Sequence, residues 1–226
     1  YKRQICKSSI NIDDNNNLEL TKNNVKNLIK EITKSGSKSA VASSGLSMQY
    51  AIMMGLVDFA QTSYPNKKIK FIVPPNCYGG TNDQARRVAD CIPNVDIIDL
   101  LVDGENNMVN SLDTILEEIS QENSVPLIIA EIPTNPRVEV PDLNNLKNVL
   151  DKKRFTQIGD IAISPIFILD QTFCPNFNFL GSDAILSEIR TISYVSGSKF
   201  PSGGKCTAGY CIGNEHTIQI MDKIEL

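Results

Sequence analysis

The chain has 226 residues, of which 41% are apolar, and its 22 basic and 26 acidic side chains give a net charge of −4. This composition excludes a disordered chain, a collagen and a coiled coil. The acidic balance also argues against a dedicated nucleic-acid-binding protein, which would carry a basic surplus. No apolar run reaches the roughly 20 residues that a membrane-spanning helix needs, so a membrane is not an expected partner.

The first part of the chain, residues 1–38, is predicted to be a polar segment that contains one helix. Thr21 has the side chain and position of a helix N-cap. Ser35-Gly36-Ser37 is the predicted end of this helix. Apolar residues at helical spacing predict one face that packs against a core, and they are Val25, Leu28, Ile29 and Ile32.

From residue 39 onward, short apolar strands alternate with amphipathic helices. The predicted strands span 39–42, 70–73, 95–100, 127–130, 165–169, 191–195 and 208–212. The predicted helices span 46–60 and 83–91, and two more begin at the caps Ser111 and Asp142. Strands that are apolar on both faces, separated by amphipathic helices, are typical of a mostly parallel sheet covered by helices on each side. The sequence therefore predicts an α/β fold, with residues 39–226 as one large domain.

The cysteines and the single histidine restrict the chemistry that this chain can perform. Six cysteines occur without a C-x-x-C pair, and His216 is the only histidine, so a zinc site is not expected. Unpaired cysteines at this chain length favour reduced thiols and a cytoplasmic location. His216 lies in a predicted turn that enters a helix, where a catalytic role is not expected. An enzyme built on this chain would then use a lysine or a carboxylate as its nucleophile or base.

Unusual residues gather where the predicted strands end, and in open α/β sheets ligands bind beyond the carboxyl ends of the strands. A small glycine-containing turn that enters a helix, as at Gly45, suits a phosphate. The glycines after Tyr78 let the backbone approach a ligand while the ring covers it. Asp170 ends a buried strand, where a carboxylate needs a positive partner. The segments are Ser43-Ser44-Gly45-Leu46, Cys77-Tyr78-Gly79-Gly80-Thr81, Glu131-Ile132-Pro133-Thr134-Asn135-Pro136, Asp170-Gln171-Thr172-Phe173 and Ser196-Gly197-Ser198-Lys199-Phe200.

Each of these segments also has a purely structural interpretation. Ser44 can be a plain N-cap, Tyr78 a packed surface residue, and Asp170 the cap of a following turn. The segment 131–136, with its two prolines, can be a rigid connection. The last segment is not a nucleotide-binding P-loop, because Lys199 stands where that motif has its first glycine.

Taken together and in order, these segments resemble the pyridoxal-phosphate (PLP) enzymes of cysteine and methionine metabolism. This family includes cystathionine gamma-synthases, cystathionine lyases, methionine gamma-lyases and O-acetylhomoserine sulfhydrylases. The resemblance covers roughly residues 40–213. It implies the large domain of an aspartate-aminotransferase-like fold, PLP as cofactor and an amino-acid substrate. The implied reaction is β- or γ-elimination or replacement on sulfur amino acids or homoserine derivatives, in a homodimer or homotetramer.

The resemblance also assigns roles to individual residues. Lys199 corresponds to the catalytic lysine that forms a Schiff base with the cofactor and then moves protons. Asp170 corresponds to the partner of the pyridinium nitrogen, and Tyr78 to the catalytic-site ring that stacks on the cofactor. Glu131 is expected to support this shell. The other implied cofactor-binding residues are Ser44, Gly45, Leu46, Asn135, Thr172, Ser196 and Ser198.

The chain departs from the family at several positions. Gln171 stands where the family usually has asparagine, and Gly204-Lys205 where it often has a histidine. Tyr1-Lys2-Arg3 supplies the Tyr-x-Arg, without the Asn-Pro, of the segment that reaches a neighbouring subunit's phosphate. The family's small C-terminal domain is expected to be absent after Leu226. Two other interpretations stay open: a cofactor-less interaction module and a PLP-dependent aminotransferase.

Overall fold

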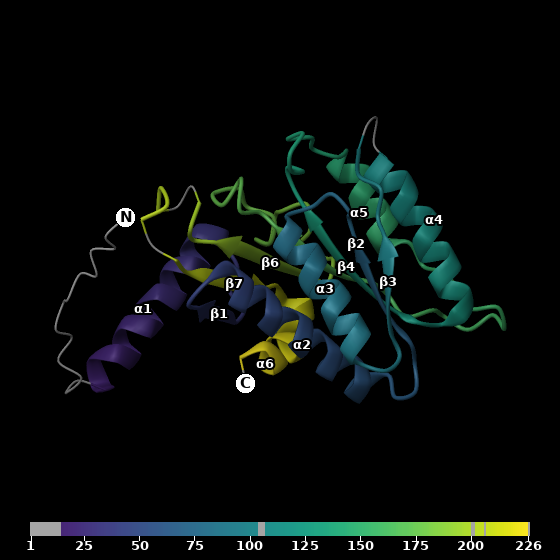
Figure 1. Ribbon diagram of the computed structural model, residues 1–226, viewed down its shortest axis with the longest axis horizontal. Helices are drawn as coiled ribbons and strands as arrows, with labels where there is room; N and C mark the ends of the chain where they lie inside the picture. The colour runs from purple at the N-terminus through teal and green to yellow at the C-terminus, as the bar shows by residue number, and fades with distance from the viewer. Residues whose placement is uncertain (1–14, 104–106, 200–201, 206, 226) are drawn as a thin grey trace.

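Seven strands form one sheet between two layers of helices (Figure 1), and the sheet order is β1-β7-β6-β5-β4-β2-β3. The computed structural model describes residues 15–103, 107–199, 202–205 and 207–225. The strands β2 to β6 pair in parallel, whereas β7 runs antiparallel to both of its neighbours, β1 and β6. The predicted α/β fold with a mostly parallel sheet is therefore confirmed.

The strands and helices follow the alternation that the sequence predicts. The strands are β1 (Ser39–Ala42), β2 (Ile69–Val73), β3 (Val95–Asp99), β4 (Val125–Glu131), β5 (Ile166–Asp170), β6 (Thr191–Ser196) and β7 (Gly209–Gly213). The helices are α1 (Asn15–Thr33), α2 (Gly45–Ser63), α3 (Gly79–Cys91), α4 (Asn107–Glu122), α5 (Leu143–Asp151), the 3-10 helix η1 (Glu215–Thr217) and α6 (Ile218–Ile224). No helix among the described residues is long and apolar enough to cross a membrane.

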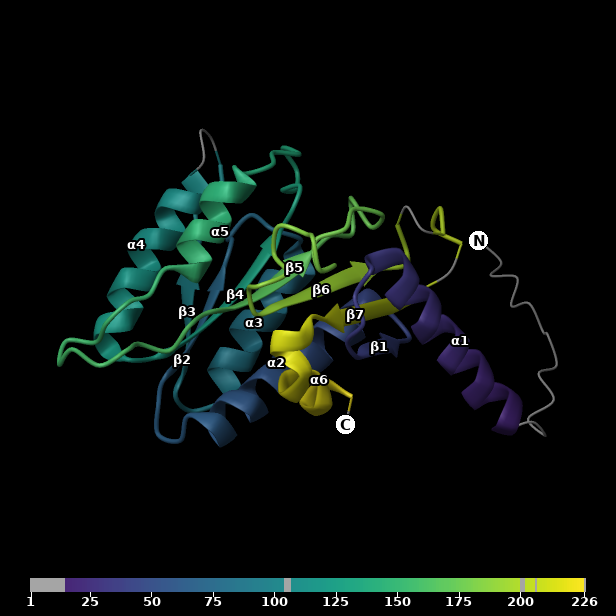
Figure 2. The ribbon, with the colours of Figure 1, turned by 180° about the vertical axis from the view of Figure 1, so that it is seen from behind.

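Both faces of the sheet are buried, because helices cover each of them. Successive side chains of a strand point to opposite faces and so enter different cores. Phe71 and Ile168 face a core that includes α2, α3 and α6. Their neighbours Ile72 and Leu169 face a second core that includes α4 and α5. Figure 2 shows α4 and α5 from this second side. A sheet that is buried on both faces requires strands that are apolar throughout. Polar side chains can gather only at the strand ends, which the helices leave open.

Helix α2 lies over β1, β7 and β6, at one end of the sheet, and packs closely against α6. Gly55 makes this approach possible, because a Cβ at its position would lie 2.6 Å from Ile224 Cγ1 and 2.9 Å from the Ile224 backbone nitrogen. Gly55→Ala is expected to lower the free energy of unfolding by about 1–3 kcal/mol through overpacking. This loss exceeds the gain of up to about 1 kcal/mol that alanine brings to a helix.

Urea denaturation measures this effect. Gly36→Ala is the control, because nothing lies within 4 Å of a Cβ added there, and its stability should stay within about 0.5 kcal/mol of the wild type. Equal unfolding free energies for the two variants would contradict the close contact between α2 and α6.

The predicted start and core face of the first helix are wrong. Helix α1 begins at Asn15, and the Thr21 hydroxyl donates to the Asn17 carbonyl inside the helix, so Thr21 is no N-cap. Ile29 is the only buried residue of the predicted apolar stripe; the other members, Val25, Leu28 and Ile32, are exposed. The reason is that α1 lies against β1, a four-residue strand at the sheet edge, and then extends away from the body (Figure 1).

Two other helices begin earlier than predicted. Helix α3 begins at Gly79 instead of residue 83, because the Tyr78 carbonyl already accepts from the Thr81 and Asn82 amides. Glycine pairs favour loops by propensity, and tertiary packing overrides that preference here. Ser111 lies inside α4, whereas Asp142 caps α5 as predicted by accepting from the Asn144 and Asn145 amides.

Candidate functional site

A cavity of about 360 Å³ opens at the carboxyl ends of β4, β5 and β6, next to the first turn of α2. This volume lies in the range of small-molecule sites. Every residue that the sequence predicts for the site lines this cavity, together with Glu131 and two further aromatic residues. The lining residues are Ser44, Gly45, Leu46, Tyr78, Glu131, Asn135, Asp170, Thr172, Phe173, Tyr194, Ser196, Ser198 and Lys199.

One end of the cavity, called here the α2 end, is formed by Gly45, Leu46, Ser196 and Ser198. Ser44 caps α2, because its hydroxyl accepts from the Ser47 amide at 3.1 Å. The structural interpretation of Ser44 as an N-cap is therefore correct. The first-turn amides of Gly45 and Leu46 have no partner within the helix, and such amides favour an anion. A cluster of hydroxyls and amides of this kind suits a phosphate.

Backbone geometry keeps the α2 end open. A Cβ at Gly45 would lie 2.6 Å from the Tyr194 hydroxyl and 2.7 Å from Ser196 Oγ. Only glycine therefore allows α2 and β6 to approach each other this closely. The hydroxyls of Ser196 and Ser198 lie 3.0 Å apart. The arrangement therefore brings the hydroxyls after β6 up to the first turn of α2.

Asp170, the last residue of β5, lies at the base of the cavity. Its carboxylate accepts from the Thr172 amide at 2.9 Å, and no basic side chain within the described ranges forms an ion pair with it. Burial raises its pKa from 3.8 to about 6. Thr172 Oγ1 in turn accepts from the Ser196 amide at 3.0 Å, which ties the ends of β5 and β6 together. A buried carboxylate without an ion-pair partner among the described residues provides a site for a protonated ring nitrogen or another cation.

Lys199 and Tyr78 meet across the mouth of the cavity. The Lys199 ammonium lies 5.8 Å from the centroid of the Tyr78 ring, within the range of a cation–π contact. The Tyr78 amide donates to Glu131 Oε1 at 2.7 Å. The position of the ring at the start of α3 is thus fixed from the end of β4.

Glu131 has a buried carboxyl group, and only one of its two oxygens accepts a hydrogen bond from a described residue. Its Oε2 is buried and makes no hydrogen bond to any described residue. Burial raises its pKa from 4.5 to about 7, and the negative charge of Asp170 adds to this effect. A proton on Glu131 near neutral pH therefore avoids an unpaired buried charge.

Glu131→Gln is expected to flatten the pH dependence of stability. Because the folded-state pKa lies above the value of 4.5 for a free carboxyl, the stabilising contribution of Glu131 is full below about pH 4.5. It is lost as the pH rises through about 7. The unfolding free energy of the variant should fall by about 1–3 kcal/mol less than that of the wild type between about pH 5 and 8.

Urea denaturation across this pH range measures the difference. Glu118→Gln, at an exposed position of α4, should keep the wild-type profile. Parallel profiles for wild type and Glu131→Gln would show that Glu131 does not titrate in this window.

Tyr194 is the lining residue that the sequence analysis missed. It lies within β6, in the segment 191–195 that the sequence predicts only as a strand. The signal that could have identified it is strand periodicity, because residues 194 and 196 point to the same face of β6. Phe173, which follows Thr172 in a predicted segment, is partly exposed at the cavity.

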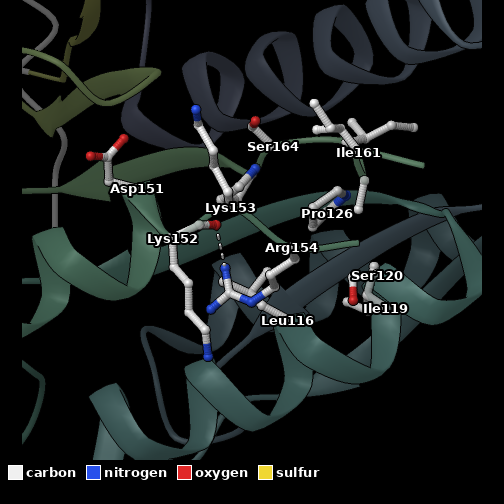
Figure 3. A pocket seen from close by; sticks show the side chains of 13 residues that line it. Leu116, Ile119, Ser120, Pro126, Asp151, Lys152, Lys153, Arg154, Ile161 and Ser164 are labelled. Atoms are coloured by element: carbon white, nitrogen blue, oxygen red, sulfur yellow. Dashed lines mark hydrogen bonds between the residues drawn. The ribbon is translucent and has the colours of Figure 1, made fainter. Parts of the chain in front are cut away.

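A second hollow lies at the opposite edge of the sheet, beside the start of β4 and β5. It measures about 40 Å³, and Figure 3 shows the Arg154 side chain with its guanidinium directed back at the Lys152 carbonyl. Arg154 is buried and pairs with Asp113 at 2.6 Å. The charge is therefore already neutralised, and the hollow is too small for a substrate.

His216 lies in η1, away from the cavity, where the neighbouring Asn214 amide donates to Thr191 at the start of β6. The absence of a catalytic role for His216 stays a prediction. The segment Tyr1-Lys2-Arg3 and residues 200 and 206, which the sequence analysis also considered, lie outside the described residues.

The arrangement of the strands and helices is similar to that of several solved structures. Cystathionine gamma-lyase CalE6 from Micromonospora echinospora matches over 90% of this chain with a TM-score of 0.61 and 16% sequence identity. The apo form of CalE6, described as a methionine gamma-lyase, matches over 90% with a TM-score of 0.60 and 16% identity. MetB from Corynebacterium glutamicum matches over 89% with a TM-score of 0.58 and 14% identity.

These matches bear on the fold. This chain spans 45%, 47% and 44% of those three chains, slightly less than half of each. No protein-family model and no curated protein sequence matches it. The fold class expected from the sequence, an α/β domain of the kind found in cystathionine and methionine gamma-lyases, is confirmed.

Proposed function

We propose that this chain is the cofactor-binding domain of a PLP-dependent enzyme. The observation that carries the proposal is a single cavity with a buried, unpaired carboxylate at its base and an amine at its mouth. Asp170 needs a cation, and Lys199 is the basic residue among those that line the cavity. A pyridinium ring with an aldehyde and a phosphate meets both requirements and gives the hydroxyls and amides of the α2 end a ligand.

The residues fit this group in size and in chemistry. Asp170 holds the proton of the ring nitrogen, and Tyr78 covers one face of the ring. Lys199 would bind the cofactor at its aldehyde and would move the proton of the substrate's α-carbon. The amides of Gly45 and Leu46 and the hydroxyls of Ser196 and Ser198 would bind the phosphate, with Ser44 and Thr172 holding these ligands in place. Asn135 would hydrogen-bond near the phenolic oxygen of the cofactor or the substrate carboxylate. When bound, the cofactor supplies an electron sink for charge that develops at the α-carbon.

The proposed reaction is β- or γ-elimination or replacement on a sulfur amino acid or a homoserine derivative. The sequence segments around the cavity support this choice, as does the similarity in fold to proteins described as cystathionine and methionine gamma-lyases. The proposed assembly is a homodimer or homotetramer. It is supported by the exposed apolar face of α1, which carries Leu18, Val25, Leu28 and Ile32, because contiguous apolar surface marks interaction sites.

The first experiment is an absorbance spectrum of the purified chain with PLP, before and after borohydride, followed by peptide mapping. The absorbance band of a Schiff base and a reduced cofactor on the peptide that contains Lys199 are the expected results. The absence of both would contradict the proposal and favour an interaction module without a cofactor.

The second experiment separates the reaction classes once cofactor binding is established. Incubation with cystathionine, methionine and O-acetylhomoserine should release a keto acid, and with the first two also a thiol. Amino transfer to an added keto acid, without these elimination products, would instead identify an aminotransferase.

A further inference from the structure

Tyr194 has a buried ring and a hydroxyl that lies beside Gly45 at the cavity. The residue is only 3% exposed, yet it lines the cavity. No residue within the described ranges hydrogen-bonds to its hydroxyl. A phenol hydroxyl can donate one hydrogen bond and accept others, so this hydroxyl has an unused capacity to bind a ligand in the cavity.

The position of the hydroxyl is defined by Gly45. A Cβ at Gly45 would lie 2.6 Å from the Tyr194 hydroxyl and 2.7 Å from Ser196 Oγ. The two hydroxyls therefore approach the same point at the first residue of α2. Ser198 Oγ lies 3.0 Å from Ser196 Oγ. Three hydroxyls and the first-turn amides of a 19-residue helix thus gather at the α2 end.

The surroundings keep the Tyr194 hydroxyl protonated. Burial raises its pKa well above the usual value of 10, and the charges of Asp170 and Glu131 act in the same direction. The phenol is therefore a permanent hydrogen-bond donor. An anion is the ligand that uses such a donor best, because hydrogen bonds to charged acceptors are stronger than neutral ones.

We propose that the Tyr194 hydroxyl binds the phosphate of the cofactor, as a third hydroxyl beside Ser196 and Ser198. This inference rests on the proposed function and adds a residue to its phosphate site. The site needs such a donor, because Lys199 is the cation among the residues that line the cavity, and the proposal assigns Lys199 to the aldehyde. Neutral hydroxyls and helix amides therefore bind the dianion.

The test compares two probes, PLP and pyridoxal, which differ only by the phosphate. Tyr194→Phe removes the hydroxyl and keeps the ring. The dissociation constant for PLP is expected to rise about 10-fold or more, as for a lost hydrogen bond to a charged group. The dissociation constant for pyridoxal should stay within about twofold of the wild type, because pyridoxal offers the hydroxyl no anion.

Tyr210→Phe is the matched control. Tyr210 lies on the neighbouring strand β7, and it packs against the core on the opposite face of the sheet from Tyr194. Both dissociation constants should be unchanged in this variant. If Tyr194→Phe loses its native circular dichroism, Tyr194→Met is measured with the same probes.

The outcomes are distinguishable. Equal losses of affinity for PLP and pyridoxal would show that the Tyr194 hydroxyl contacts the pyridine ring of the cofactor and not its phosphate. This result would overturn the inference. Wild-type affinity for PLP in Tyr194→Phe would overturn the inference and leave the proposed function in place. Failure of the wild-type chain to bind PLP would overturn both.

Discussion

Lys199→Ala is expected to abolish the borohydride-stable attachment of PLP and to lower turnover of an amino-acid substrate by about 10²–10⁴-fold or more. The side chain follows β6 and projects over the Tyr78 ring, 5.8 Å from its centroid. No other amine lines the cavity among the described residues. Both the covalent attachment and the transfer of the α-carbon proton therefore depend on this one group.

The variant should still bind PLP without a covalent bond. The proposed ligands Asp170, Gly45 and Ser196 are untouched by the substitution, so binding and attachment are separable in the same sample. Lys153→Ala is the control, because Lys153 lines the small hollow at the opposite edge of the sheet. Peptide mapping that finds the reduced cofactor on another lysine of Lys199→Ala would exclude Lys199 as the attachment site.

Asp170→Asn is expected to change stability and cofactor binding in opposite directions. Burial raises the pKa of Asp170 from 3.8 to about 6, so its contribution to stability is full below about pH 4 and is lost as the pH rises through about 6. At pH 8 the charged form therefore costs stability in the cofactor-free chain. Asparagine has the same shape without the charge and should raise the unfolding free energy by about 1–3 kcal/mol.

The same substitution should weaken PLP binding by about 30-fold or more, since it leaves the protonated ring nitrogen without its buried partner. Turnover should fall as well, because an unprotonated ring is a poor electron sink. Urea denaturation without cofactor and absorbance titration with PLP give the two quantities. Asp183→Asn, at an exposed position, should alter neither. A variant that loses stability and binding together would indicate a structural role for Asp170.

The sequence predicts the fold because its strongest signals are local. Apolar strands such as 127–130 and the cap at Asp142 depend on neighbouring residues, and the structure confirms both. The gathering of the site residues at one edge follows from parallel strands, whose carboxyl ends meet there. The roles of these residues toward a cofactor stay predictions.

What the sequence does not predict depends on contacts between distant segments. The apolar stripe of α1 has the pattern of a core helix, yet Leu28 is 56% exposed, because a short edge strand offers little surface to cover it. The antiparallel direction of β7 is set by its pairing with β1 and β6. Tyr194 has the pattern of a core residue, and only the position of Gly45 across from it suggests the role that we propose for its hydroxyl.

The order of the strands has a consequence for synthesis on the ribosome. Ala40 in β1 pairs with Cys211 in β7, so β1 has no partner strand until almost the whole described chain has been translated. The neighbouring strands β2, β3 and β4 pair with one another much earlier. Because distant pairings form slowly, Asp170 and Glu131 reach their places before Gly45 meets Tyr194. The α2 end of the cavity is therefore the last part of the site to be assembled.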